Sequence, residues 1–257
     1  IVSGGTLYVK YIKTISFIAT TFIANQAMQG AVVHSILTHT HRFVDCFFNQ
    51  NQANRDAGSL MVDQGKTILV QNSTFIENIA KWSGGAIFIK DSKFVHIVSN
   101  IFNGNYAKSG GSMAVFGTSM HILQCKFHYN EAEAEGGAVF MQNSQRLSCL
   151  HSYFKKNLAK KGGVINVLNL QRLELFSCNF VKNKAQTNGA SVTGKSIVEF
   201  INSQSKFLGN IARLSGCIFA ENVERLTNVQ GLFFINKAQE KGGALFIINS
   251  KILYCIN

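Results

Sequence analysis

The sequence predicts an all-β solenoid, a chain that winds repeatedly into similar turns, and three observations lead to this prediction. A short motif recurs along the whole chain about every 26 residues. Apolar residues alternate within the repeats, as in Val95-x-Ile97 and Leu173-x-Leu175, which is the period of a β-strand. Every copy also contains glycine, which destabilises a helix by about 1 kcal/mol per residue relative to alanine.

The motif starts with Phe-x-x-Asn. Its phenylalanines are Phe22, Phe48, Phe75, Phe102, Phe127, Phe154, Phe180, Phe207 and Phe233. Its asparagines are Asn25, Asn51, Asn78, Asn105, Asn130, Asn157, Asn183, Asn210 and Asn236, separated by 26, 27, 27, 25, 27, 26, 27 and 26 residues. An alanine follows two residues after each asparagine, and a glycine follows the alanine, as in Ala80 and Gly85.

Each column of repeated residues has a physical role in such a turn. We expect the phenylalanines to stack inside the core, and the asparagines to form a ladder in which each amide bonds the next. Asparagine also tolerates the left-handed backbone of a tight corner. Glycine supplies positive φ or a close approach between turns.

Three short strands joined by turns fit one repeat. The prediction is therefore a single-domain, right-handed parallel β-helix over residues 1–257, with about nine coils. Neither end shows a polar capping segment, so we expect the chain to be a segment of a longer protein that continues in both directions.

The pairing of Phe-x-x-Asn with Gly-Gly-Ala-Ile resembles a known repeat. Phe75–Asn78 with Gly84–Ile87 is similar to the repeats of polymorphic outer-membrane proteins, a family of autotransported bacterial adhesins, and to repeats in large protist surface proteins. The resemblance covers the whole chain, although four copies depart from the Gly-Gly pair. It implies a surface-displayed adhesive or structural role, and hence an extracellular or cell-surface location.

Carbohydrate enzymes also use β-helices, and a catalytic site of that kind would require a pair of acidic residues. The chain has four aspartates, and its one acidic cluster is Glu131, Glu133 and Glu135. No two carboxylates share a column on adjacent coils, whereas glycoside hydrolysis requires a pair. We therefore expect no enzyme activity, no catalytic residues and no cofactor.

His96 and His121 occupy one column on adjacent coils, six residues before their phenylalanines. No carboxylate or cysteine completes a ligand set in that column, so we expect no metal site. No two of the six cysteines share a column on adjacent coils, so we expect free thiols. Free thiols favour a reducing compartment, which leaves an intracellular assembly open as the alternative location. Asn72-Ser73-Thr74 is a candidate glycosylation site at Asn72.

Two stripes of apolar residues fall on positions that should point outward. The first lies three residues after the glycine, and the second lies four residues before the core phenylalanine. Candidate interface residues on the first stripe are Phe88, Phe140, Phe219 and Phe246, which share it with Val33 and Val192. Those on the second stripe are Leu123, Leu150 and Phe176. Contiguous exposed apolar stripes are typical of interfaces. If the phenylalanines of the first stripe are buried within the chain, that face offers no interface.

The sequence therefore favours a rigid structural or adhesive scaffold that binds a protein partner, or another copy of itself, along a lateral face. The formal net charge of +12 adds an acidic partner or glycan as a candidate, with no specific binding of nucleic acid. No apolar run is long enough to span a membrane. Two alternatives stay open: a carbohydrate-binding or carbohydrate-cleaving β-helix, and a non-catalytic building block of a larger ciliary or cytoskeletal assembly.

Overall fold

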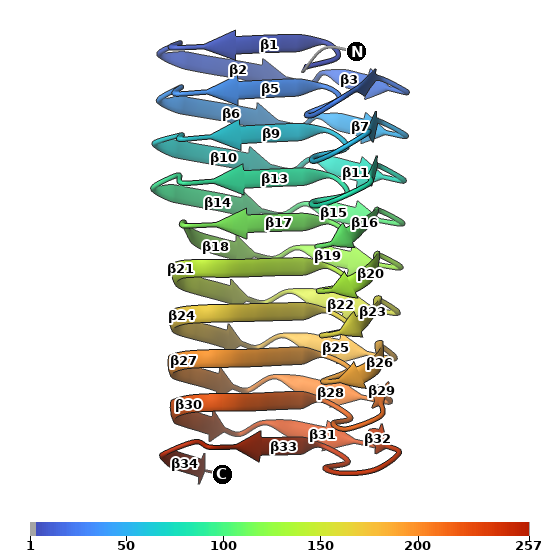
Figure 1. Cartoon of the computed structure of the whole chain (residues 1–257), viewed down its shortest axis with the longest axis vertical. Coiled ribbons are helices and arrows are strands. Elements are labelled where there is room, and N and C mark those ends of the chain that lie inside the picture. Colours follow the sequence, from blue (N-terminus) through green and yellow to red (C-terminus); the bar gives the residue numbers. More distant parts are fainter. Residues whose placement is uncertain (1–3, 257) are drawn as a thin grey trace.

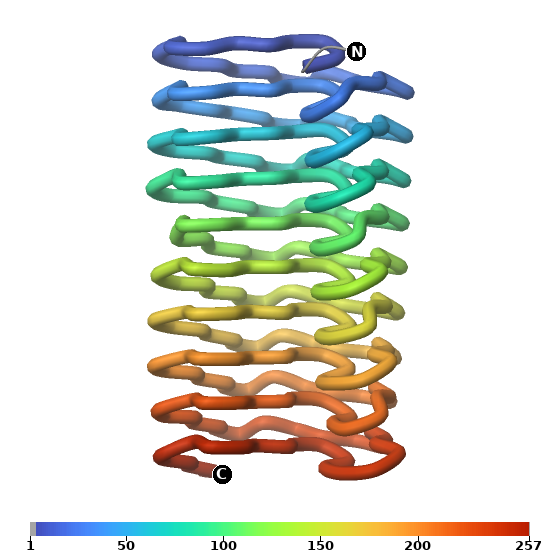
Figure 2. The backbone as a smooth tube through the Cα atoms, viewed as in Figure 1, coloured from blue at the N-terminus to red at the C-terminus, as the bar shows by residue number. Residues whose placement is uncertain are grey.

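The computed structural model describes residues 4–256 and is a parallel β-helix (Figure 1). The chain winds through about ten turns, against the nine expected, and its two ends lie at opposite ends of the long axis (Figure 2). All strand pairings are parallel and join each turn to the next. The described residues contain no helix, and the fold is all-β as the repeat predicts.

The turns within residues 7–135 contain four strand segments each, whereas the turns within residues 139–238 contain three, as expected, and the segments form four faces of the solenoid. The first face consists of β1 (Leu7–Lys10), β5 (Val33–Ile36), β9 (Leu60–Asp63), β13 (Ile87–Lys90), β17 (Met113–Phe116) and β33 (Leu245–Ile248). The second face consists of β2 (Thr14–Ile18), β6 (Thr40–Val44), β10 (Thr67–Gln71), β14 (Phe94–Val98), β18 (Ser119–Leu123) and β34 (Ile252–Ile256). In four turns one long strand runs across both of these faces: β21 (Val139–Leu150), β24 (Ile165–Phe176), β27 (Val192–Ser203) and β30 (Ile218–Val229).

The other two faces are narrower. The third face consists of β3 (Thr21–Ile23), β7 (Phe47–Asn49), β11 (Thr74–Ile76), β15 (Ile101–Asn103), β19 (Lys126–His128), β22 (Tyr153–Lys155), β25 (Asn179–Val181), β28 (Lys206–Leu208) and β31 (Leu232–Phe234). The fourth consists of β4 (Gln26–Ala27), β8 (Gln52–Ala53), β12 (Ile79–Ala80), β16 (Tyr106–Ser109), β20 (Glu131–Glu135), β23 (Leu158–Lys161), β26 (Lys184–Asn188), β29 (Ile211–Ala212) and β32 (Lys237–Ala238).

The nine phenylalanines of the motif form one column at the centre of the core. Neighbouring rings are stacked with centroids 4.5 to 5.0 Å apart. From Phe48 to Phe207 the side chains are fully buried. This spacing is the distance between neighbouring strands, about 4.8 Å, so identical side chains in register are forced into contact.

The nine asparagines form a continuous ladder at the corner between the third and fourth faces. In Asn78, for example, Nδ2 donates to Oδ1 of Asn105 at 3.0 Å and to the carbonyl of Phe48 at 3.1 Å. Oδ1 of Asn78 accepts from both the backbone N–H and the Nδ2 of Asn51. The left-handed backbone expected of these asparagines belongs instead to the residue before each, such as Glu77 with φ 50°.

The glycine column is offset by one residue in two turns. Val33 pairs with Leu60, and Val192 pairs with Ile165, and all four point inward. Gly30 and Gly189 therefore lie level with Gly84, whose φ is 67°, and not with Gly85. A Cβ at Gly85 would lie 2.0 Å from the carbonyl oxygen of Gly111, so this second position needs a close approach between turns.

A polar pair interrupts the apolar core in the turn of β5 and β6. Oγ of Ser35 and Nε2 of His41 are 2.7 Å apart, and both residues are fully buried. Ser35 stands between Val9 and Val62 in its column, and His41 stands between Ile15 and Ile68. Burial lowers the pKa of His41 to about 4, so the imidazole is neutral at pH 7.

Lowering the pH from 7 to 4 should reduce the free energy of unfolding by about 3 kcal/mol through His41 alone. The unfolded chain takes up a proton below its ordinary pKa near 6.5, whereas the folded chain takes it up only near 4. This contribution is therefore complete above pH 6.5 and is lost as the pH falls. Other groups also titrate between these pH values, so urea unfolding should show a loss that is larger by about 3 kcal/mol in the wild type than in Ser35→Val/His41→Ile. Equal losses in both proteins would contradict the prediction.

Candidate functional site

One turn is shorter than its neighbours at the corner between the first and second faces. Thr118 is followed directly by Ser119, which pairs with Phe94. The turn before has Lys93 between Ser92 and Phe94, and the turn after has Gln145 between Ser144 and Arg146. In Figures 1 and 2 the bend between β17 and β18 is set in from those above and below it. This missing residue, together with one residue fewer between Asn105 and Gly111 than between Asn78 and Gly85, accounts for the 25-residue step between Asn105 and Asn130.

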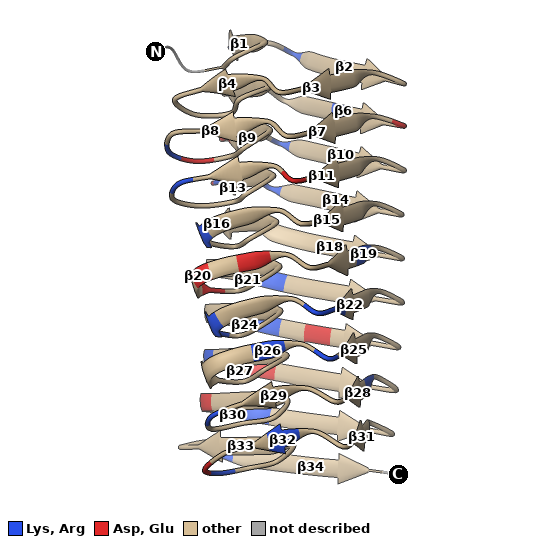
Figure 3. Cartoon of the chain, turned by 90° about the vertical axis from the view of Figure 1, so that its right-hand side faces the viewer, with Lys and Arg blue, Asp and Glu red and all other residues tan. Residues whose placement is uncertain are grey.

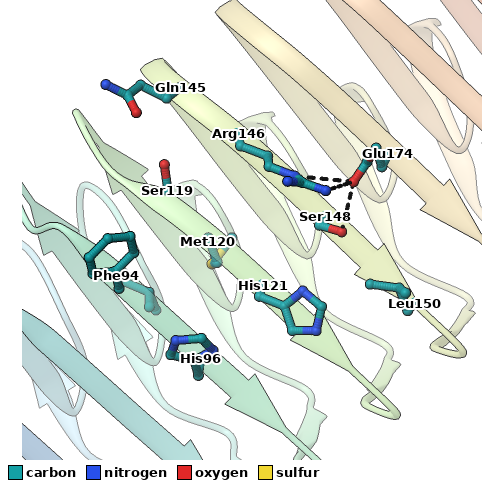
Figure 4. A pocket seen from close by; sticks show the side chains of 11 residues that line it. Phe94, His96, Ser119, Met120, His121, Gln145, Arg146, Ser148, Leu150 and Glu174 are labelled. Carbon is teal, nitrogen blue, oxygen red and sulfur yellow. Dashed lines mark hydrogen bonds and ion pairs between the residues drawn. The ribbon is translucent and has the colours of Figure 1, made fainter.

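The missing residue leaves a notch that opens onto a groove. The notch has a volume of about 390 Å³ and is bounded by Lys93, Gly117 and Gln145. The groove continues along the outer surface of the second face, has a volume of about 650 Å³ and shares Phe94, Ser119 and Gln145 with the notch. Figure 4 shows its side chains, which come from β14, β18, β21 and β24. The groove is thus supported by a rigid parallel sheet.

Phe94 and Gln145 lie at one end of the groove. The side chain of Phe94 is 55% exposed, because its neighbours in the column, Thr67 and Ser119, are too small to cover the ring. Gln145 has no hydrogen-bond partner among residues 4–256, and Figure 4 shows it at the rim of the groove. An exposed ring beside an unpaired amide offers an apolar surface and hydrogen-bonding capacity to a ligand.

His96 and His121 lie side by side on β14 and β18, with ring centroids 6.2 Å apart. Burial lowers the pKa of His121, and the charges of His96 and Arg146 lower it further. His121 is therefore a neutral donor and acceptor at pH 7. Within residues 4–256 no group of three or more His, Cys, Asp or Glu side chains is arranged to hold a metal ion.

An ion-pair network closes the other end of the groove. Glu174 accepts hydrogen bonds from Arg146 and Arg172 and from Oγ of Ser148, the last at 3.1 Å. Arg172 also pairs with Glu199 on the next turn. Burial acts to raise the pKa of Glu174, but the hydrogen bonds from the two arginines outweigh it and hold the pKa below its ordinary value. Glu174 is therefore an ionised and fully engaged carboxylate.

The first apolar stripe is not an exposed face. Phe88, Phe140 and Phe219 are only 9%, 5% and 4% exposed, so the expectation that they form an interface is wrong. They pack outside the main core: Phe116 lies 5.4 Å from Phe88 and 5.7 Å from Phe140, measured between ring centroids. Each ring is covered by neighbouring side chains that also point outward from the first face.

The other members of that stripe differ from these three phenylalanines. Phe246 is partly buried, with the ammonium group of Lys241 lying 5.8 Å from its ring centroid. Contrary to the prediction, Val33 and Val192 do not belong to the stripe, because the glycine before each is offset by one residue, and both point into the core.

The second apolar stripe is partly exposed. Leu123, Leu150 and Phe176 stand in one outward column of the second face and are half-buried. Leu150 lines the groove, and the ring of His151 meets that of Phe176 edge-on at 5.3 Å. This column therefore extends the groove with an apolar margin, and its role as an interface stays a prediction.

The remaining sequence candidates lie away from the groove. Asn72 is exposed at a corner with φ 48°, and its glycosylation stays a prediction. The six cysteines have free thiols, as expected, although the sulfur atoms of Cys149 and Cys178 lie 3.6 Å apart in the core. Cys149 pairs with Leu175 on the next turn, and Cys178 stands three residues after Leu175, just past the corner. The two cysteines are therefore diagonal neighbours on adjacent turns.

A comparison with protein families identifies the architecture. The family described as "Right handed beta helix region" matches residues 33–205, more than half of the chain. The chain belongs to the right-handed β-helix family. Neither the curated proteins nor the solved structures include a match to this right-handed β-helix. Its described residues form no helix that could cross a membrane.

The residues that form the groove were largely missed by sequence reasoning, which singled out only His96, His121 and Leu150 among them. Phe94, Gln145 and Arg146 belong to no conspicuous motif, and Glu174 is an isolated carboxylate in the sequence. The one available signal was the 25-residue step, which marks the shortened turn. It does not by itself say at which corner the residue is missing.

Proposed function

We propose that this chain is a rigid, non-catalytic binding rod of an adhesive or structural surface protein, and that the groove on its second face holds a carbohydrate chain. The exposed ring of Phe94 beside side chains without hydrogen-bond partners carries the proposal. The apolar face of a sugar ring packs on an aromatic ring, and its hydroxyl groups exchange hydrogen bonds with imidazole and amide groups. His96, His121 and Gln145 supply those groups.

The shape of the site favours an extended ligand over a compact one. The groove lies on the outside of a sheet and crosses several turns, from β14 to β24. Each turn adds about 4.8 Å along the axis. A chain of sugar units can follow this surface, whereas a small metabolite would keep most of its surface in water.

The chemistry of the groove supports binding without cleavage. Glycoside hydrolysis uses two carboxyl groups, one of them protonated to serve as the acid. Glu174 is the one carboxylate that lines the groove, and its lowered pKa and paired arginines keep it ionised. Asp91 lines the adjoining notch beside Lys90, so the groove itself holds a single engaged carboxylate, which cannot fill both roles.

A second function, binding of a protein or of another copy on the same face, is supported by the half-buried column of Leu123, Leu150 and Phe176. Sedimentation velocity of the wild type and of Leu150→Glu tests it. We expect a larger species for the wild type that Leu150→Glu abolishes. A wild type that stays monomeric at high concentration would exclude self-association.

An immobilised panel of neutral and acidic oligosaccharides tests the carbohydrate proposal. Phe94→Ala should lower the affinity for the bound sugar at least tenfold, and insertion of one glutamine between Thr118 and Ser119 should do the same by filling the notch. Trp82→Ala is the matched control, since Trp82 is 58% exposed but lies outside the groove. Absence of any sugar binding by the wild type, or equal binding by Phe94→Ala, would refute the proposal. Release of new sugar ends would show that the groove cleaves its ligand.

A further inference from the structure

Four lysines gather at the corner between the third and fourth faces, away from the groove. Lys155 ends β22, Lys156 and Lys182 occupy left-handed corner positions with φ 55° and 53°, and Lys184 begins β26. Lys156, Lys182 and Lys184 are exposed. Figure 3 shows basic residues on successive turns around β22, β23 and β26. We call these four residues the lysine cluster.

The lysine cluster has no counter-charge in the part of the chain that the structure describes. None of its four ammonium groups lies within ion-pair distance of a carboxylate, whereas Lys161, Lys195 and Lys251 each pair with a glutamate. The column of Lys184 holds Leu158 and then Glu131, so the carboxylate in it stands two turns away. Side chains of like charge thus occupy adjacent turns about 4.8 Å apart.

The lysine cluster surrounds a shallow hollow of about 330 Å³. Lys156, Lys182 and Lys184 line it together with Leu158 and the ladder residue Asn157. The exposed ring of Tyr129 lies beside it, with Nζ of Lys156 5.1 Å from the ring centroid. The positive field reaches a neighbouring histidine: burial lowers the pKa of His128, and the charges of Lys155 and Lys126 lower it further.

We propose that the lysine cluster binds an acidic polysaccharide whose sulfate or carboxylate groups occupy the hollow and the adjacent turn. An ammonium group is a compact charge that accepts an anion from many directions, which suits irregularly placed sulfates and carboxylates. The ring of Tyr129 offers a surface on which a sugar ring can pack. Reading of the bases in nucleic acid most often uses arginine forks or several stacking aromatic side chains, whereas all four cations here are lysines. The site lies on other faces than the groove and does not depend on it.

Salt-dependent binding to two probes tests the proposal: heparin, which is sulfated, and polygalacturonate, which carries only carboxylates. Lys156→Glu/Lys182→Glu should lower the affinity for at least one probe tenfold or more. It should also reduce the slope of log affinity against log salt by roughly one to two, because two ion contacts are lost. Lys13→Glu/Lys66→Glu is the matched control, since it makes the same change in net charge at a different corner. The control should bind as the wild type does.

Loss of affinity for heparin alone would assign the site to sulfate, and loss for both probes would assign it to anionic sugars in general. Three results would overturn the proposal: equal weakening in the control, no binding of either probe by the wild type, or tighter binding of a DNA duplex or of phosphatidylserine vesicles. Thermal unfolding of both double variants verifies that each is folded. Phe94→Ala should leave binding of these probes unchanged, which separates this site from the groove.

Discussion

Replacement of Asn157 by alanine should lower the free energy of unfolding by about 4 kcal/mol, because it opens the ladder at its centre. Oδ1 of Asn157 accepts from the buried N–H of Asn130 at 3.0 Å, and its Nδ2 donates to the carbonyl of Phe127 at 3.0 Å. Alanine also breaks the side-chain bonds to Nδ2 of Asn130 and Oδ1 of Asn183, and each buried group left without a partner costs roughly 1–3 kcal/mol. Urea unfolding monitored by circular dichroism measures the loss.

Asn103→Ala is the control for this variant, since Asn103 points outward from the third face and should change the stability by less than about 0.5 kcal/mol. Asn157→Asp gives a second comparison. The aspartate keeps one acceptor oxygen but removes the donor and places a carboxylate beside the carbonyl of Phe127. It should therefore be less stable at pH 7 than at pH 4, relative to the wild type. A loss near zero for Asn157→Ala would mean that the ladder does not stabilise the turns.

Phe127→Ala should destabilise the chain by a similar amount, about 3–5 kcal/mol, by removing one ring from the central column. Phe127 is fully buried between Phe102 and Phe154, with centroid distances of 4.8 and 4.9 Å. The variant loses the buried surface of the ring and its two stacking contacts, and the side chains around the resulting cavity lose a packing partner. Phe127→Leu keeps most of the volume and should lose clearly less.

Phe234→Ala is the matched control, because Phe234 is 51% exposed. Its change in stability should stay within about 0.5 kcal/mol. Differential scanning calorimetry compares the three variants with the wild type. If Phe127→Ala and Phe234→Ala unfolded at the same temperature, the stacked column would not be the main source of core stability.

The architecture could be predicted because each turn of a solenoid repeats the same residue types at the same positions. Residues one turn apart are neighbours in space, so the columns of Phe and Asn appear as a period of about 26 residues. The expected three strands per turn are found in the turns that begin with β21, β24, β27 and β30, but the earlier turns have four, divided between the first and second faces at a bend with one left-handed residue, such as Asp91 with φ 49°. Such a residue has no fixed identity and leaves no periodic signal.

The direction of side chains was harder to predict than their column. Counting from glycine failed at Gly30 and Gly189, because the glycine that provides a positive φ and the one that allows close approach are adjacent. An error of one residue in the count exchanges the predicted inner and outer surfaces of a strand. Val33 and Val192 were therefore predicted to point outward, whereas they point inward. Phe88 did point outward, but its neighbours bury it there, which no pattern along the strand reveals.

The sequence by itself determined the β-helix, its central column and its ladder, because in-register stacking makes every turn repeat the same chemistry. Only the tertiary structure decided where that regularity breaks. The notch depends on which corner lacks a residue, and the groove depends on Phe94 and Gln145 reaching its rim from different turns. The lysine cluster likewise depends on which carboxylates are within reach of Lys156 and Lys182. These properties arise from distances between turns, which a one-dimensional pattern does not contain.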